Sequence, residues 1–241
     1  MYREHRVVAL VPAGGSGARM GTDVKKQFLT LKGRDIIYWT IKHIVDCALI
    51  DQIVLIVPAD HVLEMEEKLV QWNFHELEHT EIVVVEGGAS RQKSVYNGLK
   101  QVEPTVDIVM VHDGVRPFIP KEHLIEYLDT LCSNAQLSGV IAGLEVTDTI
   151  KCVDEQQLIT HTVDRSDKWT VQTPQVFKYK PLIMAHLQAQ KEGIDATDDA
   201  ALLERLDEKL MIMQSTSENI KITRPVDLLV AEMILNAYED K

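Results

Sequence analysis

The sequence predicts an α/β fold in which a doubly wound, mostly parallel β-sheet carries helices on both faces. Short runs rich in Val, Ile and Leu recur along the chain, and amphipathic stretches with helical periodicity separate them. After residue 144 the pattern changes to polar, alternating β-branched segments, which predict a β-hairpin arm that projects from the sheet.

The first predicted strand is VVALVP at residues 7–12, and a glycine-rich turn and the helical stretch DIIYWTIKHIVDCA (35–48) follow it. Further strands are predicted at QIVLIVP (52–58), EIVVVEG (81–87), DIVMVHDG (107–114) and SGVIAGL (138–144), with a helix at HLIEYLDTLCSN (123–134) before the last. These near-continuous apolar runs indicate strands that are buried on both faces.

The predicted arm spans about residues 146–168, where VTDTIKCVD and LITHTVDR are separated by the turn-like DEQQ. Its segments are too polar to bury a core of their own, so we expect the arm to pack on a second subunit and form a homodimer. The chain then returns through helices near YKPLIMAHLQAQKE (179–192) and ATDDAALLERL (196–206), a strand LMIMQ (210–214) and a closing helix from about Pro225.

Composition limits the kind of protein. The 241 residues carry a net charge of −12, which argues against broad binding to nucleic acid or to an anionic membrane. No apolar run of membrane-spanning length and no secretory cleavage pattern are found, so we expect a cytoplasmic protein with one domain over residues 1–241. Cys47, Cys132 and Cys152 form no C-x-x-C pair and indicate neither a disulfide framework nor a zinc knuckle.

The turn after the first strand, LVPAGGSGARMGTDVKKQF (10–28), lies where open α/β sheets bind ligands. It matches neither the G-x-G-x-x-G dinucleotide pattern, since Met20 replaces the third glycine, nor the P-loop pattern. Its distinguishing residues are Arg19, Lys25 and Lys26, which follow glycines whose backbone N–H groups are free to face an anion. A triphosphate is therefore a plausible ligand despite the acidic chain, because one lysine at about 4 Å contributes about 4 kcal/mol at intermediate dielectric.

The pattern A-x-G-x-G-x-R-M, followed by Lys-Gln-Phe, resembles the nucleotide loop of nucleotidyltransferases that make activated sugars and polyols. Further blocks narrow the resemblance to the cytidylyltransferases that act on 2-C-methyl-D-erythritol 4-phosphate. They are EGGASRQKSVYNGL (86–99), VHDGVRPF (111–118), VTDTIK (146–151), TVDRSDKWTVQTPQVF (162–177), TDDAALLE (197–204) and NIKITRPVDLLVAE (219–232). They occur in the family's order and span nearly the whole chain.

The resemblance implies attack by the phosphate of the polyol on the α-phosphorus of CTP, with release of pyrophosphate. It makes Arg19, Lys26 and Lys221 the catalytic cations. Lys25 departs from the family, which usually has proline at this position, and is a further candidate for the same role. The nucleotide is expected to contact a set of small residues and one hydroxyl, namely Pro12, Ala13, Gly14, Gly15, Gly17, Gly88 and Ser94.

Asp113 follows a predicted strand at the edge where Mg²⁺ would bridge triphosphate oxygens, so we expect it to be the metal ligand and to face the substrate. The adjacent His112 is expected to be a packed residue, because the reaction gives it no proton to move. The family places the polyol phosphate against Arg116, Thr149, Arg165 and Thr173, and some of these residues reach across from the partner's arm.

Parts of the sequence also resemble three other kinds of protein. HELEH (75–79) matches the zinc-protease pattern H-E-x-x-H, but the β-branched run IVVV begins only three residues later and no third ligand follows at the usual spacing. A cytidylyltransferase for another polyol phosphate, such as ribitol 5-phosphate, shares the loop, and TVDRSDKW favours methylerythritol phosphate. A catalytically silent nucleotide-binding subunit is expected to lose Arg19, Lys26 or Asp113, and this chain has all of them.

Overall fold

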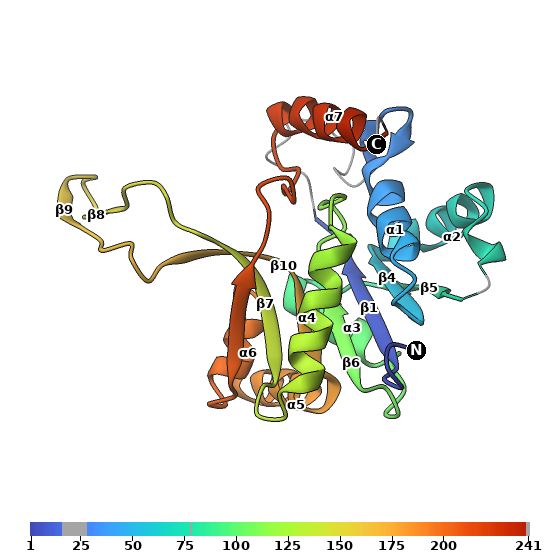
Figure 1. Cartoon of the computed structure of the whole chain (residues 1–241), viewed down its shortest axis with the longest axis horizontal. Coiled ribbons are helices and arrows are strands. Elements are labelled where there is room, and N and C mark those ends of the chain that lie inside the picture. Colours follow the sequence, from blue (N-terminus) through green and yellow to red (C-terminus); the bar gives the residue numbers. More distant parts are fainter. Residues whose placement is uncertain (16–27, 78, 240–241) are drawn as a thin grey trace.

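The computed structural model describes residues 1–15, 28–77 and 79–239, and its centre is a seven-stranded sheet with the order β11-β7-β10-β6-β1-β4-β5 (Figure 1). Within this sheet β10 runs antiparallel to β6 and β7, and the other paired neighbours are parallel. The strands are β1 (Val7–Pro12), β4 (Gln52–Val57), β5 (Glu81–Glu86), β6 (Ile108–Val111), β7 (Gly139–Glu145), β10 (Trp169–Lys178) and β11 (Leu210–Gln214).

Helices cover both faces of the sheet, as the sequence predicts. Successive residues of a strand point to opposite faces, so Val7 and Ala9 of β1 belong to one apolar core while Val8 and Leu10 belong to another. The first core includes α1 (Ile36–Asp46), α2 (Val62–Gln71) and α4 (Lys121–Ser133), and the second includes α3 (Arg91–Leu99), α5 (Tyr179–Glu192) and α6 (Ala200–Glu204). This is the doubly wound arrangement.

Strand β10 is the element that the sequence pattern does not reveal. Its centre, Gln-Thr-Pro-Gln, is polar and contains Pro174, which cannot donate a ladder hydrogen bond. The pairing of β10 with β7 shifts register between Val171 and Gln175, and this irregularity accommodates the proline inside the sheet. Because β10 lies between β6 and β7, it brings Thr173 next to the carboxyl end of β6.

The carboxyl side of the sheet is covered by a third apolar core. Here α7 (Pro225–Glu239) contributes Ala231 and Leu235, which pack with Phe118 from the loop after β6 and with Leu31. Leu31 belongs to a small hairpin, and short 3₁₀ turns flank α2. These are β2 (Thr30–Leu31), β3 (Arg34–Asp35), η3 (Ala59–His61) and η4 (Phe74–Glu76).

The predicted arm is present as an antiparallel pair, β8 (Lys151–Val153) and β9 (Ile159–Thr162), and Figure 1 shows it projecting far from the central sheet. The chain reverses at residues 154–157, where Gln157 has a positive φ of 63°. No helix within the described ranges is long and apolar enough to span a membrane.

The zinc-protease interpretation of residues 75–79 fails on backbone geometry. Phe74–Glu76 form the 3₁₀ turn η4, and Leu77 follows with an extended backbone at φ −70° and ψ 126°. His75 and His79 are therefore not on one face of a continuous helix, which that motif requires.

Candidate active site

Several of the predicted site residues lie at the edge formed by the carboxyl ends of the parallel strands. After β1, the backbone N–H of Ala13 donates to the carbonyl of Ile56 at 2.7 Å, which fixes the start of the glycine-rich turn. Gly14 and Gly15 are exposed beyond it. Gly17, Arg19, Lys25 and Lys26 lie outside the described residues, so their assignments stay predictions.

The loop after β5 is shaped by Ser94. The Ser94 hydroxyl donates to the carbonyl of Ser90 at 2.9 Å and accepts from the backbone N–H of Gly88 at 3.0 Å. A side chain at Gly88 would put its Cβ 2.5 Å from the Cβ of Lys93, so only glycine fits this close approach. Ser94 therefore fixes the loop through these hydrogen bonds, and Gly88 is exposed to solvent.

Asp113, directly beyond β6, is the electrostatic centre of the site. Its Oδ2 lies 2.8 Å from Nζ of Lys221 and 3.4 Å from Nε of Arg116, and its Oδ1 lies 3.7 Å from Nε of Arg91. Burial alone would raise the pKa of Asp113, but the charge of Lys221, and then those of Arg91 and Arg116, hold that pKa well below its ordinary value. The carboxylate is therefore ionised at any physiological pH.

Backbone and amide groups hold Arg116 in place. Its Nη1 donates to the carbonyl of Asn219 at 2.7 Å, and the Asn219 amide in turn donates to the carbonyl of Thr173 at 2.8 Å. The Thr173 hydroxyl accepts the backbone N–H of Asp113 at 3.0 Å. The strand end, the β10 proline segment and the chain before α7 therefore form one hydrogen-bonded unit.

His112 is a packed residue, as expected from the sequence. It is fully buried, and its Nε2 lies 2.8 Å from the carbonyl oxygen of Arg116. Burial lowers the pKa of His112 to about 4, so the ring is neutral at pH 7. Its role is to support the loop after β6.

These groups border a cavity of about 250 Å³. Of the predicted residues it collects Asp113, Arg116, Thr173 and Lys221. The sequence interpretation missed the remaining lining residues, which are Arg91, Val171, Gln172, Gln175, Thr197 and Asp198. All six lie inside the motif blocks 86–99, 162–177 and 197–204, so the blocks contain the signal, but a block does not by itself show which of its residues face the cavity.

Thr149 and Arg165 are not part of this cavity. Both are exposed on the arm, and the Arg165 guanidinium donates to the carbonyl of Thr147 within the arm itself. The arm that carries them projects away from the central sheet (Figure 1), and neither residue lines the cavity of its own chain.

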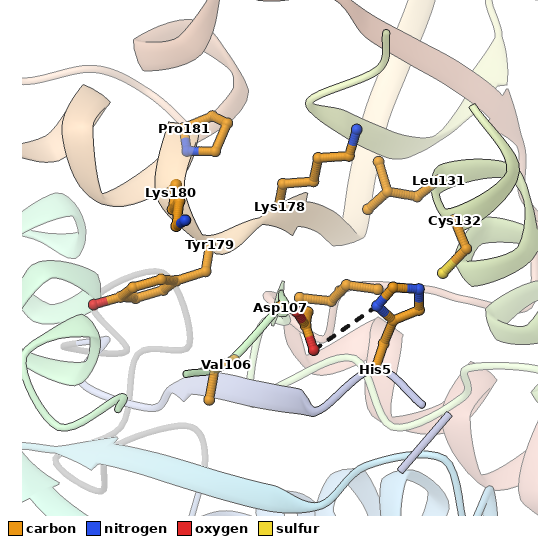
Figure 2. A pocket seen from close by; sticks show the side chains of 10 residues that line it. His5, Val106, Asp107, Leu131, Cys132, Lys178, Tyr179, Lys180 and Pro181 are labelled. Atoms are coloured by element: carbon orange, nitrogen blue, oxygen red, sulfur yellow. Dashed lines mark ion pairs between the residues drawn. The ribbon is translucent and has the colours of Figure 1, made fainter. Parts of the chain in front are cut away.

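A second cavity, of about 320 Å³, lies at the opposite edge, where β1 and β6 begin. Figure 2 shows His5 and Asp107 facing each other across it, with Nδ1 and Oδ2 3.8 Å apart, and Lys178 above them. The Lys178 Nζ already donates to the carbonyl of Ala135 at 2.8 Å. Ligands of such sheets bind beyond the carboxyl ends of the strands, so the cavity around Asp113 is the candidate active site.

This chain is similar in sequence to one family of known proteins. The sequence pattern of the family described as "IspD: 2-C-methyl-D-erythritol 4-phosphate cytidylyltransferase" matches residues 7–237. Curated proteins of that name are similar along almost their whole length. The protein from Clostridium novyi is 40% identical over 94% of this chain and 95% of its own, and the protein from Clostridium botulinum is 38% identical over 95% and 99%.

Solved structures match over a similar share of the chain, at lower sequence identity. A crystal structure of 4-diphosphocytidyl-2C-methyl-D-erythritol synthase from Anaerococcus prevotii has a TM-score of 0.81 and 28% identity, and it covers 96% of this chain and 99% of its own. The 2-C-methyl-D-erythritol 4-phosphate cytidylyltransferase of Francisella tularensis has a TM-score of 0.79 and 26% identity, with coverage of 95% and 99%.

Proposed function

The chain belongs to the 2-C-methyl-D-erythritol 4-phosphate cytidylyltransferase family, and from this premise we propose how its residues carry out the reaction. The enzyme transfers the cytidylyl group of CTP to 2-C-methyl-D-erythritol 4-phosphate. The observation that carries the proposed mechanism is the cluster of Arg91, Arg116 and Lys221 around Asp113, at the edge of the sheet where ligands bind.

The nucleophile needs no general base. The second pKa of a phosphate monoester is about 6, so at pH 7 the polyol phosphate is mostly a dianion. The P–O bond to pyrophosphate breaks as a substrate phosphate oxygen bonds to the α-phosphorus. The protein therefore supplies alignment and positive charge where two polyanions meet.

We assign these tasks to the cations. Lys221 is 37% exposed while its Nζ contacts Asp113, so it reaches the cavity surface with a charged group that is free to turn toward a phosphate. Arg116 and Thr173 are more deeply buried and fixed by hydrogen bonds, which suits them to orient the polyol phosphate. Arg19 and Lys26, outside the described residues, are proposed to hold the triphosphate, next to the nucleotide-facing residues Pro12–Gly15 and Gly88.

Asp113 is also the proposed ligand of a divalent cation. Mg²⁺ prefers carboxylate oxygens, takes one or two from a protein and completes its shell with phosphates and water. The groups around Asp113 fit this preference, because its Oδ1 lies 3.7 Å from Nε of Arg91, beyond hydrogen-bond distance, and Asp198 adds a second carboxylate to the cavity wall. When bound, such an ion would neutralise charge on the triphosphate oxygens.

The arm is proposed to act on a second copy of the chain. Thr149 and Arg165 are exposed and do not line the cavity of their own chain, and apolar arm residues such as Leu158 and Ile159 are 60% and 65% exposed. Exposed apolar side chains beside functional polar ones suit a surface that becomes covered in an assembly. A homodimer in which each arm supplies Thr149 and Arg165 to the partner's cavity accounts for both features.

The proposal places the enzyme in the cytoplasm. Cys47, Cys132 and Cys152 are all free thiols in the described structure, which suits a reducing compartment.

Pyrophosphate release with CTP and Mg²⁺ tests the substrate assignment. Parallel reactions contain 2-C-methyl-D-erythritol 4-phosphate, ribitol 5-phosphate or a sugar 1-phosphate. We expect kcat/KM to be highest for the methylerythritol substrate by at least about 100-fold, because the other acceptors differ from it in chain length or ring shape and would misplace the attacking phosphate oxygen. Faster turnover of ribitol 5-phosphate would refute the assignment.

Lys221→Ala tests the role of the cations. We expect this substitution to lower kcat/KM by about 100-fold, because one charge that stabilises the transition state is lost. Lys191→Ala, an exposed lysine on α5, is the matched control and is expected to leave the rate unchanged. Equal activity of the two variants would remove Lys221 from the mechanism.

A further inference from the structure

Arg91 is shared between two carboxylates. Its Nη1 donates to Oδ2 of Asp199 at 2.6 Å, while its Nε lies 3.7 Å from Oδ1 of Asp113. Asp199 is behind the cavity wall with its side chain 1% exposed, and Arg91 is 29% exposed. The shorter and more buried contact is the one to Asp199, so Asp199 determines where the Arg91 guanidinium lies.

Asp199 is in turn held by His186 of α5. The Nε2 of His186 lies 3.0 Å from Oδ1 of Asp199, and the His186 side chain is also 1% exposed. Burial alone would raise the pKa of Asp199, but the charge of Arg91 and the hydrogen bond from His186 keep that pKa below its ordinary value. An ionised carboxylate only accepts, so Nε2 of His186 carries the hydrogen in this pair.

Neighbouring residues hold Asp199 and Arg91 in place. Asp199 occupies the N-cap position of α6, but it is the side chain of Asp198 that accepts the backbone N–H of Ala201, at 3.0 Å. The carboxylate of Asp199 is therefore available to face Arg91 and His186. Gln92, next to Arg91, ties the incoming segment to α3, because its side chain bonds the carbonyl of Ile194 at 2.8 Å and the N–H of Ala196 at 2.7 Å.

We propose that His186 is a positioning residue for the transfer reaction, and that it acts through Asp199 to fix the guanidinium of Arg91 beside Asp113. Among the described residues, each carboxylate oxygen of Asp199 has one side-chain donor, His186 on Oδ1 and Arg91 on Oδ2. Without the His186 donor, Oδ1 is free to take a second N–H of Arg91, since a bidentate pair is the preferred geometry of Arg with a carboxylate. That rotation draws the guanidinium away from Asp113 and from the phosphates that meet there. The inference rests on the proposed function only in giving Arg91 a phosphate to contact.

The first readout does not depend on turnover. The ¹H–¹⁵N signal of the Arg91 Nε group, assigned by its loss in Arg91→Ala, is recorded in the substrate-free protein. We expect it to shift in His186→Leu and to stay in place in His186→Gln, because glutamine keeps an N–H donor near the position of the histidine Nε2. His123→Leu, which changes another histidine that has a buried unpartnered Nδ1, is the matched control and is expected to leave the signal unchanged.

The second readout is pyrophosphate release with CTP and methylerythritol phosphate. We expect His186→Leu to lower kcat/KM by about 10-fold and His186→Gln by less than about 3-fold. In the Arg91→Ala background His186→Leu should add no further loss, because the positioned group is gone. A merely structural histidine would give equal losses in both backgrounds.

An unchanged Arg91 signal in His186→Leu, or losses that add fully in the double variant, would overturn the proposal. If His186→Leu does not fold by circular dichroism, His186→Asn, which keeps a polar side chain but withdraws its donor from Asp199, takes its place with the same expected results. If the unsubstituted protein releases no pyrophosphate, the proposed function fails, and the Arg91 signal still decides the positioning.

Discussion

At the scale of single residues, the site is organised by two buried carboxylates rather than by its cations alone. Arg91, Arg116 and Lys221 lie around Asp113. Asp199, which is buried behind the cavity wall, also pairs with Arg91. Desolvating a charge costs several kcal/mol unless partners compensate it, so these carboxylates and cations depend on each other. Three cationic side chains thereby line the proposed site of a protein whose net charge is −12.

The lowered pKa of Asp199 predicts a specific acid response. Its folded-state pKa lies below the value of about 4 for an unfolded aspartate, so its stabilising contribution is complete above about pH 4 and is lost as pH falls toward the folded pKa. Between these pKa values only the unfolded state binds the proton, and the free energy of unfolding rises with pH by up to about 1.4 kcal/mol per unit from this group. Asp199→Asn should therefore unfold in urea with a shallower dependence on pH below about pH 4.

The exposed Glu155→Gln variant is the control for that comparison and should keep the slope of the unsubstituted protein. An Asp199→Asn slope as steep as that of the unsubstituted protein would mean that Asp199 is not held ionised by Arg91 and His186.

Which site residues the sequence could reveal depends on how their roles arise. Asp113 and Arg116 follow a clearly apolar strand, and strand ends are where ligands bind, so a local pattern identifies them. Arg91 and Asp199 are 108 positions apart, and their pairing exists only because α3 and α6 pack on the same face of the sheet. The Ser94 hydroxyl, which is predicted to contact the nucleotide, also accepts the backbone N–H of Gly88, a contact that local sequence does not encode.

At the scale of elements, the position of α3 relative to the sheet matters most, because this helix begins with Arg91 and contains Ser94. The helix approaches β4 closely at Gly98, where an added Cβ would lie 2.6 Å from Cδ1 of Ile56. The periodicity of apolar residues predicted this strand–helix alternation. It did not predict β10, because a proline and a polar centre argue against a central strand, and the irregular pairing that accommodates them is visible only in the sheet.

Gly98→Ala is expected to destabilise the protein despite the better helix propensity of alanine. Overpacking a core costs about 1–3 kcal/mol, and the helix gains at most about 1 kcal/mol, so we expect a net loss of about 1 kcal/mol in the free energy of unfolding. Lys93→Ala, at an exposed position of the same helix, should stay within about 0.5 kcal/mol. A Gly98→Ala protein as stable as the unsubstituted one would show that α3 has room to move off the sheet.

At the scale of the whole molecule, the proposed homodimer would complete the proposed site. The cavity of one chain holds Asp113, Arg116 and Lys221, while Thr149 and Arg165 are on an arm that leaves the body of that chain (Figure 1). The alternating polar pattern revealed the arm, but a single chain cannot reveal what its tip contacts.

Mixing two defective chains tests this exchange. Arg165→Ala and Lys221→Ala are refolded together in equal amounts, and each is expected to be poorly active alone. Half of the dimers should be hybrids in which one cavity carries both defects and the other none, so activity should recover to about a quarter of that of the unsubstituted protein. A mixture no more active than its parents, or the mass of one chain by light scattering at micromolar concentration, would contradict the shared site.

The most direct test of the central claim is a crystal structure with the cytidine diphosphate product of the methylerythritol reaction. We predict that its phosphate oxygens lie in the cavity beside Asp113, within about 3.5 Å of nitrogen atoms of Arg116 and Lys221. Phosphates bound elsewhere, with Arg116 and Lys221 still paired with Asp113 and no phosphate oxygen near their nitrogen atoms, would contradict the claim that this cluster of cations receives the reactants.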